Sequence, residues 1–163
     1  MDNKLLVPEI AQWQALNGPE FSIADWLGGV GSMSLAIAYA ELFCPTFIEH
    51  EGCVLHQQQL NIENFNSWKT ASSVTYYSQI EAVINHVHIL DLFPRDDIQE
   101  NITYLQIAHL GKALQRCYQA HLQLAFPDRE FDVFFNGDEP DLDLLDYQLS
   151  FYQPSNDQRL VEK

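Results

Sequence analysis

The period of the hydrophobic pattern changes at Pro127, and this change constrains the fold more than any other feature of the sequence. Before Pro127, apolar residues recur at helical spacing along a segment for which Asp96 or Asp97 offers an N-cap. After it, apolar residues occupy every second position over Phe131–Phe135 and again over Tyr147–Phe151. Because that alternation is typical of half-buried strands, the sequence predicts a long helix followed by a β-hairpin.

Shorter helices are predicted in the first quarter of the chain, at Pro8–Leu16, Ser22–Trp26 and Ser32–Phe43. The glycine-rich run from Gly28 to Gly31 is expected to interrupt helical structure between the second and the third of these helices. The third helix is apolar on nearly all sides, and Glu41 is its only charge. A helix of that kind is expected in the middle of a globule.

The middle of the chain combines both kinds of pattern. Phe47–Ile48 and Cys53–Leu55 predict two short strands joined by a turn, and apolar spacing predicts a helix over Ser73–Phe93. We therefore expect an α+β fold, with four to five helices packed with a small antiparallel sheet that includes the C-terminal β-hairpin. Residues 1–153 are expected to form one domain, and the polar segment 154–163 a flexible tail.

The formal charge of −15 excludes some classes of partner. Binding to nucleic acid phosphates or to anionic membranes depends on lysine and arginine, so we expect neither. The charge permits a basic protein partner or a cation, or serves solubility alone. The three cysteines form no CxxC motif, and the N-terminus resembles no signal peptide, so we expect a cytoplasmic protein.

Acidic residues are concentrated after Pro127, where Asp128–Asp146 holds eight acids and one base. The helical segment Asn101–Pro127 holds no acid. The loop Gly137–Asp146 between the two predicted strands is therefore a candidate surface for a basic partner, since charge steers association and apolar side chains anchor it. The residues assigned to partner binding are Asp138, Glu139, Asp141, Asp143 and Asp146. Three leucines lie among them, and they either anchor a partner or fold back onto the core: Leu142, Leu144 and Leu145.

His109, Lys112 and Arg116 form a short basic stripe at helical spacing. This stripe either faces solvent or meets the acidic loop, in the same molecule or in a second copy. Contact between the stripe and the acidic loop of a second copy would give a charge-matched homodimer.

A different class of function would place a pocket between the helices and the sheet. The polar residues assigned to such a pocket are Glu41, Tyr118 and His121. His121 lies on the apolar face of the long helix, where a histidine either acts as an acid or base or is a hydrogen-bonded core residue. No nucleophile or carboxylate partner can be assigned to it from sequence, and we predict no catalytic residue.

The histidine spacings argue against a metal site. His86 and His88 are the closest pair, and on the helix predicted at Ser73–Phe93 they would leave opposite flanks and share no ion. The acidic loop fails the EF-hand pattern, because an EF-hand requires oxygen ligands at positions one, three and five. We therefore predict no metal and no cofactor.

The function expected from the sequence is that of a small acidic cytoplasmic protein. It would be a non-enzymatic binding or inhibitory module for a basic protein partner. A small enzyme or ligand-binding protein is the alternative.

Overall fold

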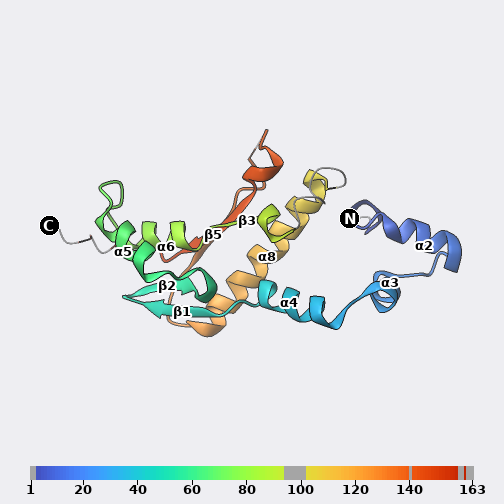
Figure 1. The fold of residues 1–163 in the computed structure, drawn as a ribbon, viewed down its shortest axis with the longest axis horizontal. Coiled ribbons are helices and arrows are strands. Elements are labelled where there is room, and N and C mark those ends of the chain that lie inside the picture. The colour runs from blue at the N-terminus through green and yellow to red at the C-terminus, as the bar shows by residue number, and fades with distance from the viewer. Residues whose placement is uncertain (1–2, 94–101, 140, 158–159, 161–163) are drawn as a thin grey trace. The chain divides into compact units, whose positions relative to one another are not determined.

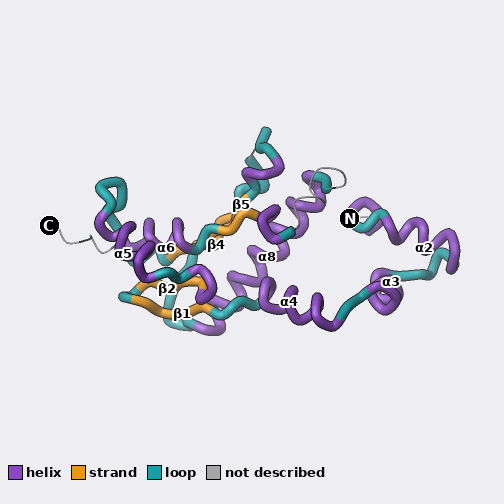
Figure 2. Tube along the Cα trace, in the orientation of Figure 1, coloured by secondary structure: helices purple, strands orange, loops and turns teal. Residues whose placement is uncertain are grey.

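The computed structural model describes residues 3–93, 102–139, 141–157 and 160. The chain divides into two compact units, Met1–Glu41 and Leu42–Lys163, and each is described by itself (Figure 1). The expected α+β class is confirmed, since helices accompany a two-stranded and a three-stranded antiparallel sheet (Figure 2). The single domain expected over 1–153 stays a prediction.

The N-terminal unit is helical, with α1 (Asn3–Leu6), α2 (Glu9–Asn17), α3 (Ile23–Val30) and most of α4 (Met33–Phe43). Ser22 caps α3 through reciprocal hydrogen bonds with Asp25, which form a capping box. The break expected within Gly28–Gly31 lies at the end of this run, because α3 continues through Gly28 and Gly29 to Val30. The helix ends where the N–H of Gly31 donates to the carbonyl of Leu27.

The burial expected for α4 is wrong. None of its residues is buried, and the side chains of Met33 and Ile37 are 78% and 61% exposed. A helix that is apolar on all sides needs neighbours on all sides to be buried. A unit as short as Met1–Glu41 has too little volume to supply them.

The second unit begins with the hairpin of β1 (Phe47–His50) and β2 (Cys53–His56), which confirms the predicted pair of short strands. The turn residues Glu51 and Gly52 both have positive φ, at 49° and 81°. Two such residues form the turn whose twist matches that of the flanking strands, and glycine adopts this conformation without strain.

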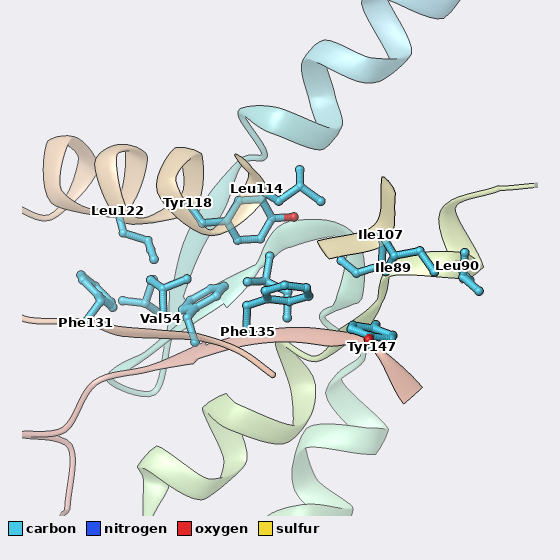
Figure 3. Packing of buried hydrophobic residues seen from close by; sticks show 13 residues of the cluster. Val54, Ile89, Leu90, Ile107, Leu114, Tyr118, Leu122, Phe131, Phe135 and Tyr147 are labelled. Carbon is cyan, nitrogen blue, oxygen red and sulfur yellow. The ribbon is translucent and has the colours of Figure 1, made fainter. Parts of the chain in front are cut away.

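The second sheet has the order β3-β5-β4, with β3 (Val87–His88), β5 (Gln148–Tyr152) and β4 (Asp132–Phe135). The predicted alternation is confirmed, because β4 and β5 pair as neighbours and every second residue is buried. Helix α8 (Tyr104–Ala125) packs against these strands. Figure 3 shows Leu114, Tyr118 and Leu122 pointing from α8 toward the strand residues.

The long helix differs from its prediction at both ends. It begins at Tyr104, where the side chain of Thr103 caps it, and the caps proposed at Asp96 and Asp97 lie outside the described residues. The apolar face is also placed slightly differently near its end. Helical spacing from the buried Leu114 and Tyr118 leads to Leu122, which is fully buried, whereas Leu124 is 81% exposed.

The helix predicted over Ser73–Phe93 is wrong in its extent. The structure has α5 (Ile62–Thr70) and α6 (Tyr77–Ile84), followed by β3 and a 3-10 turn over Ile89–Leu92. Pairing with β5 overrides the helical spacing, since Val87 lies opposite Leu149 and His88 opposite Gln148. Two further 3-10 turns are short and lie at Gln57–Gln59 and Leu144–Asp146.

Two buried polar side chains join the two sheets, one from Glu81 of α6 and one from Asn85 directly after this helix. Glu81 is fully buried and accepts hydrogen bonds from the backbone N–H of Val54, at 2.7 Å, and of Gln153, at 2.8 Å. Asn85 donates to the carbonyls of Val54 and Phe151 and accepts from the N–H of His56. These side chains satisfy backbone groups that would otherwise be buried without partners.

The segment after Pro154 contacts α6 and the residues before it. The N–H of Ser78 donates to the carbonyl of Asn156, and the N–H of Leu160 donates to the carbonyl of Thr75. Leu160 also packs against the smaller hydrophobic cluster that contains Phe65 and Ile80. The flexibility expected for 154–163 stays a prediction.

Candidate functional site

The acidic loop Gly137–Asp146 is closed at its base by one buried side chain. Asn136 is 4% exposed, and its Nδ2 donates to the carbonyl of Asp146 at 2.9 Å. Its Oδ1 accepts from the N–H of Gln148 at 2.8 Å. These bonds tie the end of β4 to the start of β5, so the loop leaves the sheet from a fixed base.

The carboxylates of the loop do not all have the same role. Asp138 forms an ion pair with Lys112, with Oδ1 and Nζ 2.7 Å apart. Asp143 accepts from the N–H of Leu145 and thereby caps the short turn Leu144–Asp146. Glu139, Asp141 and Asp146 are exposed. All five residues assigned to partner binding thus lie on one loop, and Asp138 is partly neutralised there.

The sequence left open whether the three leucines of the loop pack onto the core or are exposed to a partner, and the structure shows both arrangements. Leu142 and Leu144 are partly buried and pack against the main hydrophobic cluster. Leu145 is 57% exposed. Leu142 and Leu144 therefore anchor the loop to the core, and Leu145 remains exposed in the acidic segment.

The basic stripe meets the acidic loop within the same molecule, through the pair of Lys112 and Asp138. Arg116 is exposed, and among the described residues it forms no ion pair. It borders an open hollow of 490 Å³, of which no lining residue is acidic. That hollow is lined by Gln115, Arg116, Gln119, Ala120, Gln123 and Val133.

The residues assigned to a pocket have three different environments. Tyr118 is 1% exposed, and its burial raises its pKa to about 12. The ring of His121 is 5.5 Å from that of Phe47, which also contacts Tyr118. Glu41 is exposed and ends the N-terminal unit. Tyr118 and His121 are therefore neighbours in an aromatic cluster, and a catalytic or ligand-binding role for them stays a prediction.

His86 and His88 do not lie on a helix, so the helical spacing that would have separated them does not apply. The helix ends at Ile84, and the two rings lie in contact, with their centroids 4.4 Å apart. Within the described part of the chain, no group of three or more histidine, cysteine, aspartate or glutamate residues is suited to a metal ion.

Glu81 and Asn85 are two of the buried polar residues that sequence reasoning missed. Their spacing of four places both on one side of a helix, and this is the signal that could have found them. Their bonds go to backbone groups of the sheets, which gives them a role in joining the two sheets.

No known protein family, curated protein or solved structure matches this chain. Among the described helices, none has both the length and the apolar character required to cross a bilayer.

Proposed function

We propose that this protein is a non-enzymatic binding module, and that its acidic loop Gly137–Asp146 engages a basic protein partner. The observation that carries the proposal is the combination of exposed acidic and apolar side chains on a loop with a fixed base. The exposed Leu145 lies between the exposed Asp143 and Asp146 in the sequence, on a segment whose ends are joined by Asn136. A segment whose ends are already joined loses less conformational entropy on binding than a free one, which favours affinity.

The chemistry of such a surface suits a partner with lysine or arginine around an apolar pocket. The carboxylates accelerate encounter with a positive surface, and the leucine supplies apolar area that becomes buried. The same acidic character within an inhibitory module would suit a basic enzyme or toxin as the partner.

The cytoplasm is the proposed location. This part of the proposal rests on the cysteines, because Cys44, Cys53 and Cys117 are all free thiols. Free thiols are stable in a reducing compartment.

The test begins with native mass spectrometry of the protein isolated gently from its own cells. The variant Asp141→Asn with Asp143→Asn then removes two loop charges. A matched control, Asp128→Asn with Glu130→Gln, removes two exposed charges outside the loop. We expect a basic protein that dissociates as salt is raised, that the control variant retains and that the loop variant binds more weakly.

Two results would overturn this proposal. One is an equal loss of affinity in both double variants, because the effect would then follow net charge alone. The other is an unchanged affinity and salt dependence in the loop variant.

A further inference from the structure

His86 and His88 lie together at the start of the three-stranded sheet. His88 belongs to β3, and His86 directly precedes this strand. In extended chain, residues two apart point to the same side. Their ring centroids are 4.4 Å apart, with an angle of 63° between the ring planes.

The hydrogen bond of His88 decides which of its nitrogens has a lone pair. Nδ1 lies 3.0 Å from the carbonyl oxygen of Leu145. A carbonyl oxygen only accepts, so Nδ1 is the atom that carries the proton. Nε2 of the neutral ring is therefore a free base. A histidine that donates from one nitrogen to a backbone carbonyl and offers the other is the usual form of a metal ligand.

His86 offers the same nitrogen. Its Nε2 is buried and has no hydrogen-bond partner. An imidazole binds a metal ion in its neutral form, through a nitrogen that carries no proton.

A second buried polar atom without a partner belongs to the neighbouring Gln59. Its Nε2 donates to the backbone carbonyl of His86 at 3.2 Å, which places its amide beside that residue. The Oε1 of the same amide is buried and unpartnered. Buried polar groups are rarely left without a partner. An unpartnered imidazole nitrogen and an amide oxygen are both atoms that donate electron pairs to a cation.

We propose that His86 and His88 bind a divalent transition-metal cation, of the class of Zn²⁺, Ni²⁺ or Cu²⁺, through their Nε2 atoms. Imidazole nitrogen suits these ions better than Mg²⁺ or Ca²⁺, which prefer oxygen. Among the described residues no third histidine, cysteine or carboxylate completes the set, so the other coordination positions belong to water or to an added ligand. This site is separate from partner binding by the acidic loop and does not depend on it.

Calorimetric titration of the metal-free protein with Zn²⁺ tests the proposal. We expect His86→Gln and His88→Gln each to weaken binding at least tenfold. The matched control is His109→Gln, which removes an exposed histidine of α8 and should leave the affinity unchanged. Circular dichroism shows whether each variant keeps its fold.

A measurement on the wild-type chain avoids any dependence on folding of the variants. In long-range ¹H–¹⁵N spectra of the imidazoles, saturation with Zn²⁺ should shift the Nε2 signals of His86 and His88 and leave that of His109 in place. Unmoved Nε2 signals at 86 and 88, or equal Zn²⁺ affinity in the double variant His86→Gln with His88→Gln, would overturn the proposal.

Discussion

Gly111 of α8 lies directly against the ring of Phe135 in β4, so close that a Cβ at Gly111 would come within 2.2 Å of the ring. Gly137 lies equally close to the same ring, at 2.1 Å for a Cβ. The ring is thus held between two glycines and is 7% exposed. This contact brings α8 against the strand from which the acidic loop begins.

Gly111→Ala is therefore expected to destabilise the protein by about 1–3 kcal/mol, because the ring has no room to move away. The gain in helix propensity, about 1 kcal/mol, acts in the opposite direction. Urea unfolding measures the net effect. Gly28→Ala is the control, since a Cβ at this helical position meets nothing within 4 Å. A variant at Gly111 as stable as the wild type would contradict the close contact.

Glu81→Gln is expected to lower the free energy of unfolding by about 1–3 kcal/mol. Both oxygens of Glu81 accept hydrogen bonds, so the amide NH₂ of a glutamine would face an N–H donor. Chemical denaturation measures the loss, and Glu130→Gln, on the surface, is the control. If the two variants are equally stable, Glu81 does not hold these backbone groups.

Glu81 also makes the stability of the protein depend on pH, with a contribution that falls as pH rises. Burial raises the pKa of Glu81 above its ordinary value of 4.5. A group with a raised folded-state pKa binds more protons folded than unfolded. Its contribution to stability is thus complete below 4.5 and is lost as pH rises through the folded pKa. Melting curves across this range should show wild type losing stability relative to Glu81→Gln as pH rises, and a constant difference would contradict it.

Asn136→Ala is expected to open the base of the acidic loop. The substitution leaves the N–H of Gln148 and the carbonyl of Asp146 without their partner, at a cost of about 1–3 kcal/mol. Limited proteolysis with an enzyme that cuts beside acidic residues should cleave the loop faster in this variant. Asn64→Ala, at an exposed position of α5, is the control and should be cleaved at the wild-type rate.

Lys112→Met is expected to change stability little, by about 0–1 kcal/mol, because its pair with Asp138 is exposed to solvent. Arg116→Met removes the same charge from α8, and Arg116 forms no ion pair with any residue that the structure describes. The difference between the two variants in thermal unfolding therefore measures the pair itself. A difference well above 1 kcal/mol would show that this contact holds the loop more firmly than its exposure implies.

The strands were the part of the fold best predicted from sequence. Phe131, Val133 and Phe135 alternate as expected, and so do Leu149 and Phe151 on the paired strand. Alternation survives into the structure because one face of the sheet packs on α8 and fixes the register.

The candidate site was predicted only in its composition. The sequence places the acids on one loop, but the closure by Asn136 and the division among the leucines depend on contacts with the sheet. The contact of His86 and His88 was missed for the same reason. The spacing of Val87 and Leu90 is that of a helix. The segment is extended because Val87 and His88 pair with β5, and this pairing cannot be seen in the sequence.

The side chain of Asn85 has a consequence for how the second unit folds. Its bonds reach 31 residues back to Val54 and 66 residues forward to Phe151. The side-chain hydrogen bonds of Asn85 are complete only when both the early hairpin and the late one have arrived, so this junction forms late in the folding reaction and makes it cooperative. A substitution at Asn85 should therefore act mainly on the rate of unfolding and leave the rate of folding almost unchanged.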